Sequence, residues 1–332
     1  MSESQRLAAY LSQLNFGAHA DALHIKGNAQ MNQNRSQIHL GASMYVPCTQ
    51  PVENIVAIAN GQKYPFLRSV IFCLEDAVRV DELQFAINNL GKALKLFEDG
   101  PEKPMRFIRV RNPEVLGKCV RMRGIQHVDG FVLPKITAAS MPRYLAMLTE
   151  KDPFKLMPTL ETKEVFNAKE MGKLRDLLQN DDIAKDRILA LRIGGNDLLH
   201  CVGVRRDPRR TIYDTPVGEV IKRLSGEFIP FGFGLTAPVC ECINNPEVLA
   251  QEVELDLLQG LFGKTAIHPD QIRLIEAGFR VDACDLEEAR RILMPDAAAV
   301  FKMNGRMCEP TTHTKWARAI IERADLYGVR EA

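Results

Sequence analysis

Short hydrophobic runs alternate with longer segments of helical periodicity through most of the chain. Helical spacing is clearest at 81–97, 138–148 and 165–178, and Thr215 before Pro216 and Asn244 or Asn245 before Pro246 are typical helix starts. The short runs predict strands at Ser43–Val46, Ser69–Leu74, Met105–Arg109, Gly130–Leu133, Leu156–Leu160, Ile188–Arg192, Ile229–Gly234 and Lys264–Ile267.

This alternation predicts an α/β protein with a parallel sheet. Continuous apolar strands separated by helices are typical of parallel strands covered by helices. About eight such repeats favour a closed (β/α)8, or TIM, barrel. The alternative is an open doubly wound sheet, which usually has a glycine-rich turn after its first strand. No such turn follows Ser43–Val46.

The pattern divides the chain into three parts. Residues 1–37 are expected to be an extension with a helical pattern at Leu7–Leu14 and a polar loop at Asn28–Gln37. Residues 38–283 hold the barrel repeats. Residues 284–332 show helical patterns at 286–293, 296–301 and 313–326 with no strand between them. We expect these helices to pack on the barrel rim or on a neighbouring subunit.

Composition narrows the functional classes. The 332 residues carry 43 Lys and Arg against 42 Asp and Glu, for a formal net charge of +1. This balance gives no support to nucleic-acid or membrane-surface binding. No apolar run is long enough to span a membrane, and Met1–Arg6 does not resemble a secretory signal, so we expect a cytoplasmic protein. The eight cysteines are dispersed, and the Cys240–Cys242 pair lacks zinc-ligand partners, so reduced thiols are expected.

Reactive residues of such a barrel lie at the carboxyl ends of its strands. Glu161 follows one predicted strand, and Asp197 follows the next after Gly194 and Gly195. Neighbouring strands are about 4.8 Å apart, so both carboxylates could reach one small cation. Two carboxylates with waters and an anionic substrate are a usual Mg²⁺ site. The alternative is that both residues cap the helices that follow.

Two arginines end the third predicted strand. Arg109 and Arg111 fall on one face if the strand continues to Arg111. An arginine at this place can bind a carboxylate in a fork and stabilise an oxyanion. We expect Arg109, which lies deeper in the strand, to contact substrate, and Arg111 remains the second candidate.

The remaining strand ends supply further candidates. Glu75 and Asp76 could orient a metal-bound water or pair with an arginine, although a helix cap is the alternative. Pro134 and Lys135 follow the fourth strand and could contact substrate. His268 could donate to substrate, and a buried structural histidine is equally compatible with its position.

The ordered set of these motifs resembles the HpcH/HpaI aldolase and citrate lyase β-subunit superfamily, and it spans about residues 40–325. The stretches that carry the resemblance are Met44–Pro47, Cys73–Val78, Arg109–Pro113, Val132–Lys135, Leu160–Thr162, Gly194–Asp197, Gly263–Ile272 and Gly305–Met307.

The resemblance implies a barrel of the phosphoenolpyruvate/pyruvate-binding type. It implies Mg²⁺ held by Glu161 and Asp197, a keto-acid group bound by Arg109 or Arg111, and support from Glu75 and Asp76. It also implies a homotrimer or homohexamer in which C-terminal helices reach a neighbour's site.

Three positions depart from the family pattern. Cys73 stands where Asp is usual, and Cys48 where Gly is usual. Glu309 stands where members that use acyl-CoA carry a catalytic Asp from the adjacent subunit. Glu309 could still transfer a proton, but the change puts acyl-CoA chemistry and an acyl-carrier partner in question.

The residues and the resemblance together predict a Mg²⁺-dependent carbon–carbon lyase. Its substrate would be a small oxo- or hydroxy-acid or its thioester, cleaved through a metal-stabilised enolate with Arg109 beside the same oxygen. The alternatives are a phosphoenolpyruvate-type mutase or hydrolase on the same barrel and a non-catalytic binding or scaffold protein.

Overall fold

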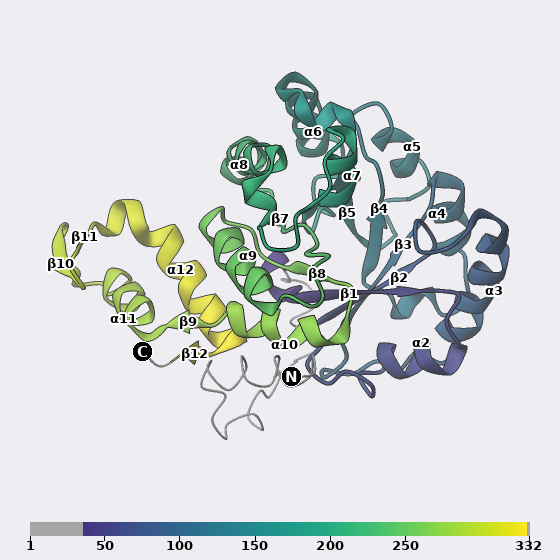
Figure 1. Cartoon of the computed structure of the whole chain (residues 1–332), viewed down its shortest axis with the longest axis horizontal. Helices are drawn as coiled ribbons and strands as arrows, with labels where there is room; N and C mark the ends of the chain where they lie inside the picture. Colours follow the sequence, from purple (N-terminus) through teal and green to yellow (C-terminus); the bar gives the residue numbers. More distant parts are fainter. Residues whose placement is uncertain (1–35, 331–332) are drawn as a thin grey trace.

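The computed structural model describes residues 36–330, and these form a (β/α)8 barrel with a C-terminal lobe beside it (Figure 1). Eight parallel strands pair in the order β7-β6-β5-β4-β3-β2-β1-β8, and the parallel bridge between Ala237 and Lys264 joins the two ends. The predicted fold class is therefore confirmed. The strands are β1 (Ala42–Pro47), β2 (Ser69–Cys73), β3 (Met105–Arg109), β4 (Gly130–Leu133), β5 (Lys155–Leu160), β6 (Leu191–Ile193), β7 (Leu235–Thr236) and β8 (Lys264–Ala266).

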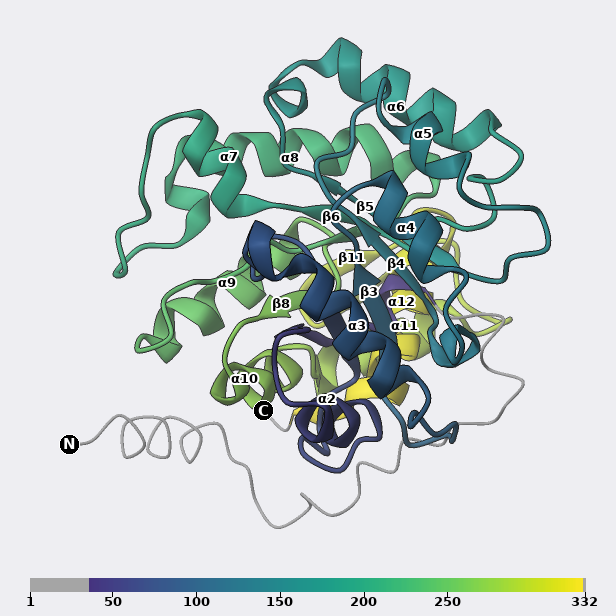
Figure 2. The same ribbon diagram turned by 90° about the vertical axis from the view of Figure 1, so that its right-hand side faces the viewer.

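Helices surround the strands, as the view turned by 90° also shows (Figure 2). The barrel helices are α2 (Val52–Ala59), α3 (Leu83–Leu94), α4 (Pro113–Cys119), α5 (Met141–Leu145), α6 (Ala168–Asn180), α7 (Gly195–Cys201), α8 (Pro216–Phe228), α9 (Pro246–Leu258) and α10 (Pro269–Gly278). The predicted helix starts at two of them are confirmed. The side chain of Thr215 accepts from the backbone N–H of Val217, and that of Asn245 accepts from Val248.

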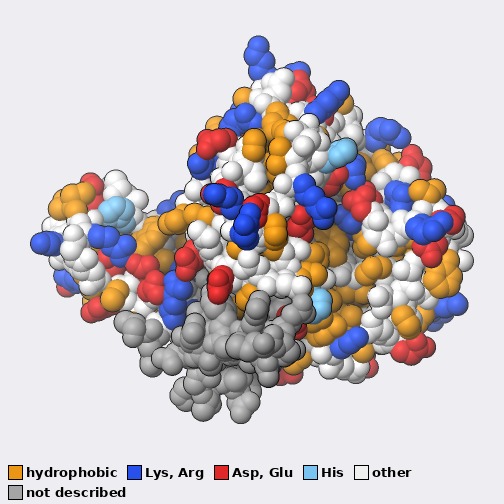
Figure 3. All heavy atoms as spheres, in the orientation of Figure 1, with side chains coloured by type: hydrophobic (Ala, Val, Ile, Leu, Met, Phe, Trp, Pro, Cys, Tyr) orange, Lys and Arg blue, Asp and Glu red, His pale blue; other side chains and the backbone are white. Residues whose placement is uncertain are grey.

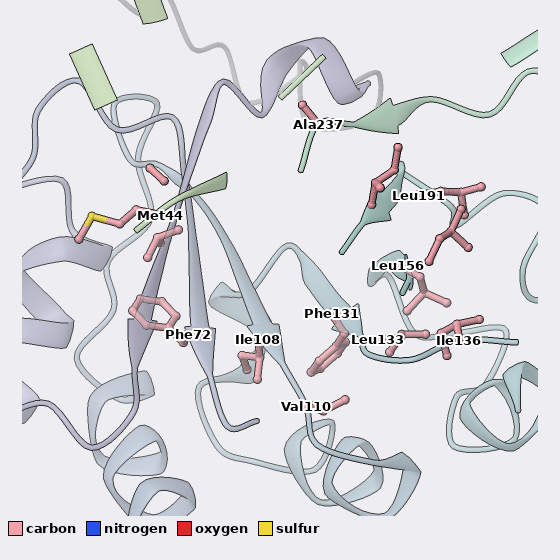
Figure 4. Packing of buried hydrophobic residues seen from close by; sticks show 14 of the residues in the cluster. Met44, Phe72, Ile108, Val110, Phe131, Leu133, Ile136, Leu156, Leu191 and Ala237 are labelled. Carbon is pink, nitrogen blue, oxygen red and sulfur yellow. The ribbon is translucent and has the colours of Figure 1, made fainter. Parts of the chain in front are cut away.

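Side chains alternate between the two faces of each strand. Figure 4 shows Phe72, Ile108, Leu133, Leu156 and Leu191 from successive strands in the shell between strands and helices. A second, smaller cluster fills the barrel interior. It consists of Leu40, Ile71, Met105, Phe107, Val132, Met157, Leu189 and Ala190, with Tyr45 packed against it. The barrel is thus closed by packed side chains rather than open as a pore.

Two strand predictions need correction. Ile229–Gly234 is not a strand: a 3-10 turn spans Ile229–Phe231, and β7 begins at Leu235. Pro230 lacks the N–H that a strand ladder needs, and Gly232 takes a φ of 89° that ends the turn. The predicted strand at Ile188–Arg192 is shifted, since β6 is Leu191–Ile193 and Ile188 makes only an isolated bridge to Leu156.

The C-terminal lobe has its own hydrophobic core. α11 (Ala283–Ile292) packs against α12 (Pro310–Tyr327), and β9 (Val281–Asp282) pairs with β12 (Val329–Arg330). The predicted helix at 296–301 is wrong, because a hairpin of β10 (Phe301–Met303) and β11 (Arg306–Cys308) lies between the helices. Asn304 and Gly305 have φ values of 49° and 77°, as a two-residue hairpin turn requires.

The other sequence expectations have mixed outcomes. The predicted helix at Leu7–Leu14 and most of the loop at 28–37 lie outside the described residues. Within 36–330, no helix is both long and apolar enough to cross a lipid bilayer. Figure 3 shows acidic and basic side chains interspersed over the visible face, in keeping with the near-zero net charge.

Candidate active site

Charged side chains from five successive strands meet at one end of the barrel. Glu75 and Asp76 follow β2, Arg109 ends β3, Lys135 follows β4, Glu161 follows β5, and Asp197 lies in the first turn of α7 after β6. We call these six residues the strand-end cluster. Contacts link all of them, directly or through Lys135, so the parallel strands bring together residues that are up to 122 positions apart.

Arg109 is held on three sides. Its Nη1 lies 3.2 Å from Glu75 Oε2 and 3.5 Å from Asp76 Oδ2. Its Nη2 donates to Cys73 Sγ at 3.1 Å, and its guanidinium carbon lies 4.7 Å from the centre of the Tyr45 ring. The side chain is mostly buried. Arg109 therefore presents a fixed positive charge, which is the arrangement needed to stabilise an oxyanion without reorganisation.

Lys135 connects the acidic residues of the cluster. Its backbone has a φ of 53°, a left-handed conformation that is uncommon for a residue with a side chain. In this conformation the N–H donates to Glu161 Oε1 at 2.7 Å. Its Nζ lies 2.8 Å from Glu75 Oε1, 3.4 Å from Asp76 Oδ1 and 3.8 Å from Asp197 Oδ1.

Glu161 is the most buried acid of the cluster, with 4% of its surface exposed. Its carboxyl group does not cap a helix, because the following helices are preceded by Thr162 and Asn167. Burial, followed by the charge of Asp197, raises the pKa of Glu161 to about 7. The cluster also contains four carboxylates, those of Glu75, Asp76, Glu161 and Asp197, but only two cationic groups, so Lys135 and Arg109 do not neutralise it when all four acids are ionised.

This charge surplus fits a divalent cation. Carboxylate oxygens are the ligands that Mg²⁺ prefers, and it usually keeps several waters beside one or two protein carboxylates. Over residues 36–330, no group of three or more His, Cys, Asp or Glu side chains is arranged to hold a metal. Glu161 and Asp197, whose charge contributes to the raised pKa of Glu161, could supply two such ligands, with water or substrate oxygens as the others.

Gly194 makes room for the Glu161 side chain. A Cβ atom at Gly194 would lie 2.3 Å from Glu161 Oε2 and 2.5 Å from Glu161 Cβ. We expect Gly194→Ala to displace this carboxylate by about 1 Å and to weaken Mg²⁺ binding by about 10²-fold. Isothermal titration calorimetry measures this loss. Gly226→Ala is the matched control, since a Cβ there meets no atom within 4 Å and should leave the affinity unchanged.

Arg111 binds backbone carbonyls and forms no ion pair with the acids of the cluster within residues 36–330. Its guanidinium donates to the backbone carbonyls of Leu74, Glu75 and Val78. Arg111 thus fastens the segment that carries Glu75 and Asp76. Of the two arginines, Arg109 is the one whose guanidinium meets the charged side chains.

Three further candidates lie outside the ion pairs of the cluster. Pro134 is buried directly before Lys135. His268 precedes α10 and accepts from the N–H of Asp270 through Nδ1, so it acts as a helix cap in this structure. Glu309 directly precedes α12 in the C-terminal lobe, where its carboxylate accepts from the Thr312 hydroxyl at 3.4 Å.

Two residues that sequence reasoning missed also border the cluster. The guanidinium carbon of Arg192, on β6, lies 5.7 Å from the centre of the same Tyr45 ring that contacts Arg109. Tyr45 is an inconspicuous member of an apolar strand, and Arg192 precedes the strand end that the sequence singled out. The only signal in the sequence that Tyr45 and Arg192 point into the barrel was the alternation of side chains between the two faces of a strand.

Comparisons with known proteins agree with this architecture. (3S)-Malyl-CoA thioesterases of Cereibacter sphaeroides strains are 26% identical over 266 residues, which is 77% of this chain and 86% of theirs. A crystal structure of CitE from Mycobacterium tuberculosis, in complex with magnesium, acetoacetate and coenzyme A, has a TM-score of 0.62. It is 21% identical and covers 87% of this chain and 99% of its own.

A citrate lyase from Burkholderia xenovorans gives a TM-score of 0.68 at 15% identity, over 88% of this chain and 94% of its own. These structural likenesses show the shared fold. A family model, that of the C–C bond lyases of the TIM-barrel fold, matches residues 34–329, which is nearly the whole described barrel and lobe. The chain therefore belongs to the C–C bond lyase family of the TIM-barrel fold.

Proposed function

We propose that this protein is a Mg²⁺-dependent carbon–carbon bond lyase that acts on a small oxo- or hydroxy-acid, free or joined to coenzyme A. The observation that carries the proposal is the strand-end cluster. It combines a buried carboxylate whose pKa is raised to about 7, a second carboxylate beside it, and the fixed guanidinium of Arg109.

The relatives support the same substrate class. The CitE structure contains magnesium, acetoacetate and coenzyme A, and the curated relatives are named for malyl-CoA. A small acid and a thioester therefore occur together among similar proteins. This chain has Glu309 where members of the family that use acyl-CoA carry Asp. Its use of coenzyme A is therefore proposed and is tested below.

Each residue of the cluster has a proposed task. Glu161 and Asp197 would hold Mg²⁺, which supplies Lewis acidity toward the substrate's oxygens when bound. Arg109 would place its positive charge beside the oxygen that becomes negative as the bond breaks. Glu75 and Asp76 position Arg109 through its Nη1, and the pairing of Lys135 with Glu75 keeps both acids in place.

Cleavage of a β-hydroxy acid or thioester requires a proton to leave its hydroxyl group. The electrons of the O–H bond then form the carbonyl of one product, and those of the carbon–carbon bond form the enolate of the other product, an oxo-acid such as pyruvate or a thioester such as acetyl-CoA, which then takes up a proton. We propose Glu309 from a neighbouring copy as the group that transfers a proton to the enolate. This role presumes the homotrimer or homohexamer that the family resemblance implies.

Thioester hydrolysis is the second candidate function, because the curated relatives are named thioesterases. Water would then attack the thioester carbonyl, and the carbon skeleton would remain intact. Both reactions develop negative charge on a carbonyl oxygen, which Arg109 could stabilise in either case.

Product analysis with (3S)-malyl-CoA separates the candidates. A lyase yields acetyl-CoA and glyoxylate, whereas a thioesterase yields malate and free coenzyme A, and mass spectrometry distinguishes the two.

Proton exchange is an independent test. A lyase of this type should exchange the methyl protons of pyruvate with D₂O in the presence of Mg²⁺, because exchange needs only the enolate. No exchange and no turnover over a panel of oxo-acids and their thioesters would contradict the lyase and favour a mutase or a scaffold role.

A further inference from the structure

The barrel interior contains a buried arginine that no carboxylate neutralises. Arg192 is 2% exposed. Its Nη2 donates to Thr265 Oγ1 at 2.6 Å, and its Nη1 lies 3.9 Å from Met157 Sδ. Among the described residues it forms no ion pair with Asp or Glu. An uncompensated buried guanidinium is costly, so its presence calls for an anion or a special structural role.

Threonines flank Arg192 on both neighbouring strands. In the sheet register Arg192 lies opposite Thr159 of β5 and opposite Thr236 of β7, so the three side chains share the interior face. The hydroxyl groups of Thr159 and Thr236 are buried and have no hydrogen-bond partner in the part of the chain that the structure describes. Such orphaned hydroxyls are rare in native proteins and point to an unseen partner.

Arg192 differs in this respect from its neighbour Arg109. The two guanidinium groups contact one aromatic ring, that of Tyr45. Arg109 is balanced by Glu75 and Asp76, whereas Arg192 has only neutral contacts. Two positive charges therefore lie beside one ring, and the protein supplies counter-charge for only one of them.

We propose that Arg192, with the hydroxyls of Thr159, Thr236 and Thr265, forms a second anion site that binds the distal carboxylate of a dicarboxylic oxo- or hydroxy-acid. The guanidinium would form paired hydrogen bonds with that carboxylate, and the threonine hydroxyls would donate to its remaining lone pairs. This inference rests on the proposed function. It narrows the substrate class from small acids in general to those with two carboxylates.

Stability measurements distinguish this site from a purely structural arginine. If Arg192 awaits a ligand, Arg192→Met removes an uncompensated charge and should leave the melting temperature of the free protein unchanged or raise it. Thr236→Val should do the same, because it deletes a hydroxyl without a protein partner at constant shape. If Arg192 holds the barrel together, Arg192→Met should lower the melting temperature and leave ligand preference unaltered.

Matched pairs of acids test the binding directly. Malate and lactate differ only in the second carboxylate, and so do 2-oxoglutarate and 2-oxobutyrate. Calorimetric titration with Mg²⁺ present gives the affinity ratio of each pair for the full-length wild type, Arg192→Met and Thr236→Val. Arg109→Met, which should weaken both members of a pair equally, serves as the comparison.

We expect at least one dicarboxylate to bind the wild type 10-fold or more tightly than its partner. Arg192→Met should bring that ratio close to one, and Thr236→Val should lower it several-fold. An unchanged ratio in Arg192→Met, or a wild-type ratio near one for both pairs, would overturn the second anion site alone. If the wild type binds none of the four acids, the second anion site is refuted, whereas turnover of (3S)-malyl-CoA in the product analysis decides the proposed function separately.

Discussion

Replacing Arg109 by methionine is expected to slow Mg²⁺-dependent proton exchange of pyruvate by about 10²–10³-fold, because the enolate oxygen loses a preorganised positive charge. Arg109 is the only guanidinium of the described residues that pairs with Glu75 and Asp76. Its contacts with Cys73 and the Tyr45 ring keep it in one orientation. Nuclear magnetic resonance of the pyruvate methyl signal in D₂O measures the exchange rate.

The controls for Arg109→Met test charge and geometry separately. Arg109→Lys retains the charge but not the fork of donors, and it should recover only part of the rate. Arg143→Met removes an exposed arginine that pairs with Glu114 on the surface, and it should leave the rate unchanged. A loss of less than about 3-fold in Arg109→Met would contradict the role assigned to this arginine.

Glu161→Gln should stabilise the metal-free protein while abolishing its response to Mg²⁺. Burial and the charge of Asp197 raise the pKa of Glu161 to about 7, above the value of about 4.3 expected in the unfolded chain. The folded state therefore binds the proton more tightly, and wild-type stability is lost as pH rises from about 4.5 to 7. Linkage puts this loss at roughly 4 kcal/mol, constant above pH 7.

Glu161→Gln has no carboxyl group at position 161, so its stability should not fall between about pH 4.5 and pH 7 for this reason. Urea unfolding in EDTA at pH 5 and pH 8 should show the stability of Glu161→Gln rising relative to wild type between these values. Added Mg²⁺ should stabilise the wild type at pH 8 and leave the variant unchanged, since only the wild type retains the ligand. If the stability difference between wild type and Glu161→Gln does not depend on pH, the pKa of Glu161 is not raised in the folded protein and the prediction is wrong.

The strand-end residues were predictable because parallel barrels bring the carboxyl ends of all strands together. That rule alone placed Glu75, Arg109, Lys135, Glu161 and Asp197 at one end of the fold, where the structure has them. It could not show that the backbone of Lys135 takes a left-handed conformation and donates to Glu161. Such a conformation depends on the contacts around it rather than on the residue type.

Buried charge inside the fold was hidden from the sequence. Lys264 is fully buried between Glu252 and Asp256 of α9, at 3.2 and 2.7 Å. An isolated lysine in a strand gives no sign that two acids of the preceding helix will face it. Arg192 was hidden for the same reason, because a three-residue strand is too short to show which side chains point inward.

The wrongly predicted elements, the β10–β11 hairpin and β7, can be traced to local features of the sequence. Asn304 and Gly305 form one of the strongest short hairpin signals, yet the surrounding residues are mixed in polarity, and the helical pattern before them dominated the prediction. β7 is only two residues long and follows a proline and two glycines, so its hydrophobic pattern was assigned to the preceding apolar turn.

A crystal soaked with Mn²⁺ as a stand-in for Mg²⁺, together with a small oxo-acid, tests the metal site most directly. Anomalous scattering locates the ion independently of any refinement of the protein. We predict one peak within about 2.2 Å of a carboxylate oxygen from each of Glu161 and Asp197. A peak bound elsewhere, or carboxylates of these two residues that face away from a common ion, would contradict the proposed site and the reaction built on it.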